Sequence, residues 1–339
     1  MKLIQSSSSR YALVFFLSFS ILIGSSYNTY LSCERFYNAD SETYMNIAKF
    51  NFTNQSLVRK YRIIVPAMAY VVSIPISKVY YKIVSDKRDK YDWPLLTGFF
   101  LINSILMALA AVLIYKIMEL QQLTALSSVV GLMAFLAGGR WAGIIAAHPV
   151  TDSLTILCIC TIVYGLLKPN RFLLAAGIII GLISKESFAL FFPMALLFSS
   201  KQTRLTVIIS ILAALLIYFG IKYLIDNASG TALQASFSED LDTFNSLKLS
   251  IQKLFSAKGV ADIFSVYGFF SLFFLTGIFY RSFRKLIRPT FNRLFIVFAL
   301  TIFVHMLLST ELARMFYLGS ALFVPFLTKC FEVHPLFSK

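Results

Sequence analysis

The chain is dominated by long apolar runs separated by short polar segments. About 20 consecutive apolar residues suffice for a helix to cross the hydrocarbon core of a bilayer. The clear runs lie at 11–31, 94–117, 123–147, 151–167, 172–184, 187–199, 205–225, 264–280, 294–310 and 314–330. This pattern predicts an all-α fold, a polytopic transmembrane helix bundle with about 10–11 crossings that forms a single transmembrane domain over residues 1–339.

The basic residues of the short loops predict how the bundle is oriented. Cytoplasmic loops carry an excess of Lys and Arg, and the strongest basic loop lies at 281–293. If 281–293 is cytoplasmic and the chain changes side at each crossing, both termini lie in the cytoplasm and the loops 32–62 and 226–263 lie on the outer side. The first apolar run carries no cleavage site of the Ala-x-Ala kind, so we expect an uncleaved first helix.

The segment 63–84 is ambiguous. It is apolar enough to span, but Pro66, Pro75 and Lys78 interrupt it. The basic loops agree on one orientation only if this segment does not cross fully, which favours ten crossings plus a re-entrant or interfacial segment. That arrangement puts the nearby basic residues, Lys82 among them, on the outer side, so a model with eleven crossings stays open.

Two further features point to the outer side. The loop 32–62 contains a stretch, 41–50, in which Tyr44, Ile47 and Ala48 share one helical face, which predicts a short helix lying in the membrane interface. The runs 172–184 and 187–199 are too short to span, with Lys185 and Glu186 at the bend between them. Such a broken pair is tolerated where it is buried in protein or lines a wet cavity.

Composition supports the membrane assignment. Hydrophobic residues make up 58% of the 339 and charged residues only 14%, with a mean hydropathy of +0.75. A soluble enzyme, a disordered protein and a nucleic-acid-binding module are excluded, because too little polar surface is available. The net charge of +15 follows from the basic loops and indicates no nucleic-acid partner. The positions of the four cysteines predict neither disulfides nor a metal cluster.

The proposed orientation places a set of ionisable residues on the outer side, several of them at the ends of apolar runs. Charge at such positions is costly, so a functional role is the default expectation, although simple pairing at helix ends is the alternative. The candidates are Asp40, Glu42, Arg62, Arg140, His148, Asp152, Lys185, Glu186, Glu311 and Arg314.

The chemistry of these groups suits transfer to a hydroxyl. Asp40 is either a helix N-cap or a general base beside the membrane surface. With Glu42 two positions on, it offers a pair of carboxylates that a divalent cation could use, and the sequence leaves a metal undecided. The cations Arg62, Lys185 and Arg314 suit a phosphate, Arg through bidentate hydrogen bonds and Lys as a point charge.

The pair His148 and Asp152 has a plain structural alternative, since it opens an apolar run where capping chemistry is ordinary. For His305, inside the run 294–310, packing is the expected role.

The order of these features resembles the GT-C superfamily of polytopic glycosyltransferases, in its bacterial branch related to protein O-mannosyltransferases and lipid A aminoarabinose transferases. The resemblance rests on order and spacing over roughly 1–200 and 294–330. The features are Asp40 with Glu42, Tyr44 with Ile47 and Ala48, Arg62 with Pro66, the series Arg140, His148 and Asp152, the turn Gly181–Glu186, and Glu311 with Arg314 and Pro325.

The resemblance implies a membrane glycosyltransferase of the bacterial cytoplasmic (inner) membrane that acts on the outer side, in cell-envelope polysaccharide chemistry. A sugar would move from a polyprenyl-phosphate-linked donor to a saccharide, lipid or protein acceptor, with inversion. Asp40, with Glu42 beside it, would be catalytic, and Lys185, Arg62 and Arg314 would meet the donor phosphate. Membrane lipids are the other expected partners, and no cofactor is certain.

Two other readings remain open from the sequence. An O-antigen-type polysaccharide polymerase also uses lipid-linked sugars, but usually through arginines in two large outer loops, and only 226–263 is large here. A transporter or another non-enzymatic membrane protein is the third reading. Transporters often show internal repeats and mid-membrane charges, and the sequence shows neither.

Overall fold

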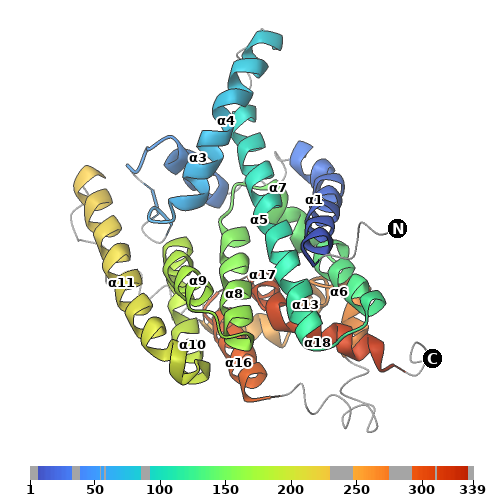
Figure 1. Ribbon diagram of the computed structural model, residues 1–339. Coiled ribbons are helices and arrows are strands. Elements are labelled where there is room, and N and C mark those ends of the chain that lie inside the picture. The colour runs from blue at the N-terminus through green and yellow to red at the C-terminus, as the bar shows by residue number, and fades with distance from the viewer. Residues whose placement is uncertain are drawn as a thin grey trace.

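The computed structural model describes residues 7–32, 39–53, 55–56, 59–84, 92–229, 247–274, 292–309 and 311–334, and in these ranges every regular element is a helix (Figure 1). The predicted all-α class is therefore confirmed for the described chain. Among the predicted features, those that lie outside it include 230–246 of the outer loop, Cys33, the end of the predicted crossing 264–280, and the basic loop as far as residue 291.

The first half of the chain forms α1 (Ser7–Leu31), α3 (Ala39–Ala48), α4 (Ile64–Ile83), α5 (Trp93–Leu120), α6 (Ala125–Ala137), α7 (Arg140–Ala147) and α8 (Asp152–Leu167). The second half forms α9 (Arg171–Ser184), η2 (Glu186–Phe191), α10 (Phe192–Phe198), α11 (Lys201–Ser229), α13 (Ala257–Phe264), η3 (Gly268–Ser271), α16 (Arg293–Leu307), α17 (Leu312–Leu318) and α18 (Ser320–Glu332).

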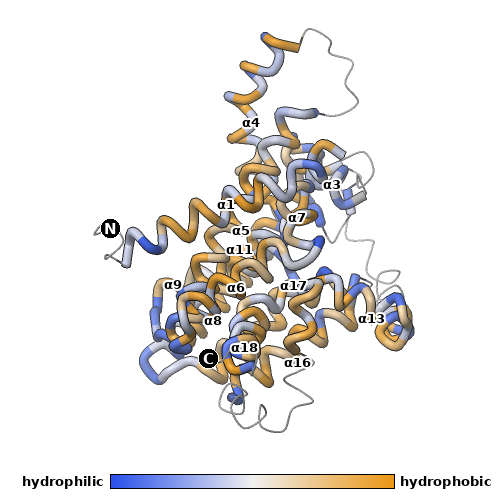
Figure 2. The backbone as a smooth tube through the Cα atoms, turned by 90° about the vertical axis from the view of Figure 1, so that its right-hand side faces the viewer, coloured by the Kyte–Doolittle hydropathy of each residue, from blue (hydrophilic) through white to orange (hydrophobic). Residues whose placement is uncertain are grey.

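Four of the described helices, α1, α4, α5 and α11, are long and apolar enough to cross a membrane, and there are six such segments if each of two bent helix pairs is one span. Hydrophobic residues run along most of the length of the helices, and hydrophilic ones gather at turns and ends (Figure 2). The chain is thus an integral membrane protein by the length and composition of its helices. The remaining predicted crossings correspond to shorter apolar helices, such as α8, α9 and α16.

Helix α5 is the centre of the bundle, and its local sequence explains its start. Asp92 caps it by accepting a hydrogen bond from the backbone N–H of Leu95 at 3.2 Å, and Pro94 occupies the first turn. Helix α1 runs beside α5 over nearly its whole length. Arg10 pairs with Glu119 at one end at 3.2 Å, and near the other end the Tyr30 and Thr97 hydroxyls are 2.7 Å apart.

Helix α4 is shifted along the bundle relative to α5. The two pack closely where Gly98 faces Ala69, because a Cβ atom on Gly98 would lie 2.3 Å from the Ala69 carbonyl oxygen. Ala69 belongs to the beginning of α4, so the rest of this helix projects beyond the start of α5 at Trp93 (Figures 1 and 2). The segment 63–84 is therefore one continuous helix rather than a broken re-entrant one, in spite of Pro75.

Glycines divide two of the predicted runs into two helices each. The run 123–147 divides into α6 and α7, which meet at 57° across Gly138 and Gly139. A Cβ atom on Gly139 would lie 2.1 Å from the backbone oxygen of Ser265, so only glycine allows this close approach. The run 314–330 likewise divides into α17 and α18 at Gly319.

Two other local predictions are confirmed. Tyr44, Ile47 and Ala48 share the buried face of α3, where they are 0%, 3% and 1% exposed. The break between the short runs falls at Lys185, whose extended backbone ends α9 and begins η2.

Candidate functional site

A cavity of about 500 Å³ lies where α3, the segment 55–62, η2, the end of α16 and the start of α17 meet. Charged side chains dominate its wall. The residues that line it are Asp40, Ser56, Arg59, Arg62, Lys185, Glu186, Ser187, Leu190, His305, Leu308, Ser309, Glu311, Arg314 and Met315. Six of the ten residues singled out from the sequence thus meet in one cavity: Asp40, Arg62, Lys185, Glu186, Glu311 and Arg314.

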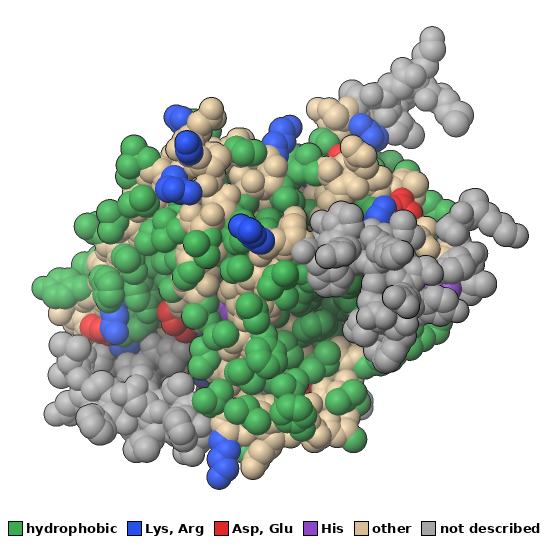
Figure 3. Space-filling model, turned by 90° about the horizontal axis from the view of Figure 1, so that it is seen from below, with side chains coloured by type: hydrophobic (Ala, Val, Ile, Leu, Met, Phe, Trp, Pro, Cys, Tyr) green, Lys and Arg blue, Asp and Glu red, His purple; other side chains and the backbone are tan. Residues whose placement is uncertain are grey.

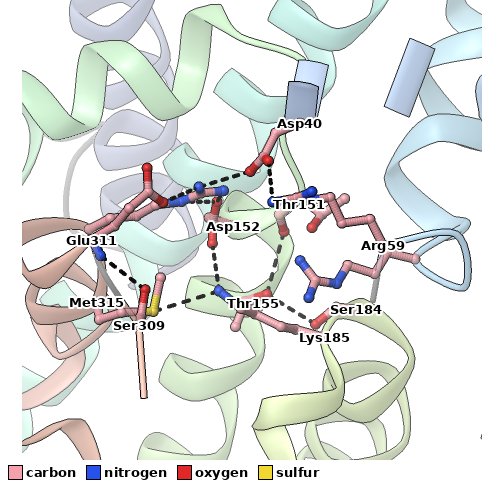
Figure 4. Close-up of polar contacts among 12 residues, drawn as sticks. Asp40, Arg59, Thr151, Asp152, Thr155, Ser184, Lys185, Ser309, Glu311 and Met315 are labelled. Atoms are coloured by element: carbon pink, nitrogen blue, oxygen red, sulfur yellow. Dashed lines mark hydrogen bonds and ion pairs between the residues drawn. The ribbon is translucent and has the colours of Figure 1, made fainter. Parts of the chain in front are cut away.

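Asp40 is held between two guanidinium groups (Figure 4). Its Oδ1 lies 2.6 Å from Nη2 of Arg59, and its Oδ2 accepts a hydrogen bond from Nη1 of Arg314 at 3.1 Å. Asp40 stands in the first turn of α3, which begins at Ala39. The interpretation of Asp40 as an N-cap therefore does not fit its position, and its carboxylate faces the cavity instead.

Arg314 connects three carboxylates. Its Nε donates to Oδ2 of Asp152 at 2.8 Å, and its Nη2 donates to the same oxygen. Its Nη1 donates to Asp40 and, at 2.5 Å, to Oε2 of Glu311 three residues earlier. The side chain is only 9% exposed. A buried guanidinium of this kind is stable only because several charged acceptors surround it.

Lys185 has a partner that the sequence did not indicate. Its Nζ lies 3.3 Å from Oδ1 of Asp152 and 3.7 Å from the sulfur of Met315. Among the described residues, the carboxylate that neutralises Lys185 is therefore that of Asp152 and not that of its chain neighbour Glu186. Adjacent residues do not face each other across an extended backbone, which is why Glu186 points elsewhere.

Glu186 instead pairs with Arg62. Nε of Arg62 donates to Oε2 of Glu186 at 3.1 Å, Nη2 donates to the other oxygen, and Nη1 donates to the Tyr44 hydroxyl at 2.9 Å. Burial works against the charge on Arg62, but Tyr44 and Glu186 outweigh it and raise the pKa of Arg62 above its ordinary value. Arg62 therefore stays a cation in the cavity wall.

Four of the sequence candidates do not line the cavity. Glu42 is on the exposed side of α3, and Arg140 pairs with Asp262 at 3.0 Å outside the cavity. His148 is buried between α7 and α8, where its backbone carbonyl accepts a hydrogen bond from Asn103. Asp152 is 1% exposed and lies behind the wall, but it acts on the cavity through Lys185 and Arg314.

The sequence does not predict Arg59 and Tyr44 as site residues, and it predicts only a packing role for His305. His305 does pack, with its ring centroid 5.2 Å from that of Phe191, but it also lines the cavity. Arg59 belongs to the basic stretch Arg59-Lys60-Tyr61-Arg62, and this concentration of charge in an outer loop was the signal that could have found it.

The charges of the site balance. Four carboxylates, those of Asp40, Asp152, Glu186 and Glu311, face four cations, those of Arg59, Arg62, Lys185 and Arg314. Among the described residues no group of three His, Cys, Asp or Glu side chains is placed to hold a metal ion. The site therefore has no surplus cation, and an external anion can bind only by taking over a cation that now pairs with one of these carboxylates.

Comparison with family models, with curated proteins and with solved structures finds no match to this chain.

Proposed function

We propose that the chain is a membrane glycosyltransferase that moves a sugar from a polyprenyl-phosphate-linked donor to an acceptor hydroxyl. The observation that carries this proposal is the position of Asp40 in a cavity of about 500 Å³ whose wall contains four cations, two of which contact its carboxylate. Such a cavity offers a carboxylate for the acceptor proton and cationic groups for a phosphate within one site. The resemblance to GT-C enzymes in the order of residues supports the same reaction.

The aromatic and charged ends of α5 support a membrane position for the site. Between Thr97 and Glu119 this helix is about 33 Å long at about 1.5 Å per residue, close to the about 30 Å of a bilayer core. Tyr30 and Trp93 pack edge to face near one end, and Arg10 and Lys116 lie at the other. Asn103, which contacts both His148 and Ser153, is about 9 Å inside the first boundary.

The opposite face supports the proposed orientation. The ends of α8 and α10 and the starts of α9 and α11 lie there, with Lys168, Arg171, Lys201 and Arg204. Lys and Arg side chains stand out on this face, and acidic ones are fewer (Figure 3). The positive-inside rule makes this the cytoplasmic face, so the cavity opens toward the outer side of the membrane.

In the proposed reaction the acceptor oxygen attacks the anomeric carbon from the side opposite the phosphate. Asp40 takes the hydroxyl proton as the new C–O bond forms. The bond between the anomeric carbon and the phosphate oxygen breaks, and the electron pair leaves with the polyprenyl phosphate. The cations of the cavity stabilise the negative charge that develops on this phosphate, and the configuration at the sugar inverts.

The test uses the purified chain in proteoliposomes with a panel of polyprenyl-phosphate sugars and an extract of cell-envelope acceptors. Release of polyprenyl phosphate is followed by mass spectrometry. Asp40→Asn is expected to lower turnover about 10² to 10⁴-fold, because it removes the proton acceptor. Glu42→Gln, a carboxylate removed from the same helix outside the cavity, is expected to retain turnover. Normal turnover of Asp40→Asn would rule out the proposed base, and release from no donor would rule out the transferase.

A further inference from the structure

The four cations of the cavity differ in how firmly the protein holds them. Arg314 donates to three carboxylates, and Arg62 makes two hydrogen bonds to Glu186 and one to Tyr44. Lys185 is 9% exposed and contacts Asp152, which is itself fully buried. Lys185 and Arg314 are the two cations of the buried Asp152, so an anion that drew either away would weaken the neutralisation of a buried carboxylate, which is costly. An anion that drew Arg62 away would break its three hydrogen bonds to Glu186 and Tyr44.

Arg59 is held differently. Its side chain is 33% exposed, and its one ion pair among the described residues is the contact of 2.6 Å with Oδ1 of Asp40. It lies in a turn, between α3 and α4, whereas Arg314 is part of a helix. Asp40 keeps a second guanidinium partner, Arg314, when Arg59 turns away. Arg59 is therefore the cation that can change partners at the smallest cost.

We propose that Arg59 binds the phosphate group of an incoming anionic lipid by exchanging Asp40 for it, and that this exchange frees Oδ1 of Asp40. The inference rests on the proposed function for the role of the freed oxygen, which would then be able to accept the acceptor proton. A site that works this way links binding of the donor to release of the base. Asp40 is paired with Arg59 when the donor is absent, and its Oδ1 is available when the donor phosphate is present.

The proposed exchange predicts opposite changes in anion affinity for substitutions of Asp40 and of Arg59, which a purely structural role of Arg59 would not produce. Asp40 competes with the ligand for Arg59, so Asp40→Asn should strengthen anion binding, while Arg59→Gln should weaken it. A hydrogen bond between charged groups is of a size that changes a dissociation constant about tenfold or more. In the Arg59→Gln background, Asp40→Asn should lose most of its effect, because no competition remains to be relieved.

A general field effect gives a different pattern. Removing any negative charge from the cavity attracts an anion somewhat, whatever Arg59 does. Glu311→Gln serves as the matched control, because Glu311 lines the same cavity but pairs with Arg314 and not with Arg59. Its effect should be the same with and without Arg59.

The experiment measures binding of farnesyl phosphate to the full-length chain in nanodiscs by titration calorimetry, with farnesol and inorganic phosphate as separate arms. We expect farnesyl phosphate to bind the wild-type chain. It should bind Arg59→Gln about tenfold more weakly than wild type, and Asp40→Asn about tenfold more tightly. Arg59→Lys should recover part of the affinity, because it restores the charge without the planar fork. Inorganic phosphate with the same dependence on Arg59 would support recognition of the phosphate group by itself, and its failure to bind would support a requirement for the lipid chain.

Three results would overturn the proposal: farnesol binding as tightly as farnesyl phosphate, absence of farnesyl phosphate binding, or an equal effect of Asp40→Asn in both Arg59 backgrounds. Size-exclusion profiles and thermal midpoints of the variants establish that each is folded. Because the titration contains no sugar and no acceptor, it can succeed when glycosyl transfer fails, and the two proposals are tested separately.

Discussion

The guanidinium of Arg314 and the carboxylate of Asp152 are joined by a hydrogen bond of 2.8 Å between Nε and Oδ2, although 162 positions separate them in the chain. Both side chains are buried, Asp152 at the start of α8 and Arg314 in α17. Charged groups in such surroundings are stable only as partners of one another. The pair therefore fixes the C-terminal part of the bundle against its middle at the depth of the cavity.

Replacement of Arg314 should destabilise the whole protein. Arg314→Gln leaves Asp152 with Lys185 alone and removes one guanidinium from both Asp40 and Glu311. Breaking a buried pair in this way typically costs about 3–5 kcal/mol, so the thermal midpoint in nanodiscs should fall by several degrees. Arg140→Gln is the matched control, since the pair with Asp262 is 55% exposed on the arginine side. Equal midpoints for the two variants would contradict the structural role of Arg314.

Lys185 and Asp152 should behave as a coupled pair. Lys185→Met keeps the apolar stem but removes one of the two cations of a buried carboxylate, so we expect a lower midpoint. Asp152→Asn added to Lys185→Met should recover part of it, because the contact between the two residues is already lost and the carboxylates of the site no longer outnumber its cations. Glu186→Gln added to Lys185→Met should recover nothing, since Glu186 pairs with Arg62. Recovery by Glu186→Gln and not by Asp152→Asn would mean that the pairing is wrong.

The local features of the fold could be predicted from the sequence because they depend on nearest neighbours. The apolar face of α3 follows from the spacing of Tyr44, Ile47 and Ala48, and the break at Lys185 follows from the shortness of the runs beside it. The bend at Gly139 could not be predicted in this way. It depends on the backbone of Ser265, which is remote in sequence.

The candidate site was predictable as a set but not as a network. Charge on the outer side, beside apolar runs, identified six of the residues that line the cavity, because charged groups near the bilayer are costly and usually have a function. Which carboxylate meets which cation depends on the packing of α3, α8, η2 and α17, and no spacing in the sequence indicates it. Glu42 shows the same limit, since two positions along α3 turn it away from the cavity that Asp40 faces.

The contact between α4 and α5 gives a test with an internal control. Gly98→Ala would place a Cβ atom 2.3 Å from the Ala69 oxygen, so the helices must separate. Overpacking of this kind typically costs about 1–3 kcal/mol, and the thermal midpoint should fall. Gly220→Ala in α11 adds the same methyl group where nothing lies within 4 Å, and it should be neutral or slightly stabilising. A midpoint of Gly98→Ala as high as that of Gly220→Ala would show that α4 does not pack here.

The position of α4 relative to the membrane can be tested by chemical labelling. In the proposed orientation α4 begins near the cavity and projects outward, so its far end stays on the outer side. Single cysteines at Glu42, Val79 and Gln202, in a chain whose four native cysteines are replaced, test this with an impermeant thiol reagent. All three positions are exposed, so accessibility depends on the membrane alone.

Intact cells should show labelling at the Glu42 and Val79 positions, and Gln202 should react only after permeabilisation. If α4 crosses the bilayer, Glu42 still reacts in intact cells but Val79 does not. The number of crossings between α1 and α11 then becomes even, so Gln202 would also react in intact cells unless another helix fails to cross. If Glu42 reacts only after permeabilisation, the whole orientation is reversed and the cavity faces the cytoplasm. The contact of Gly98 with Ala69 favours the first outcome, because it pairs the beginning of α4 with the outer end of α5 and leaves the rest of α4 beyond that end.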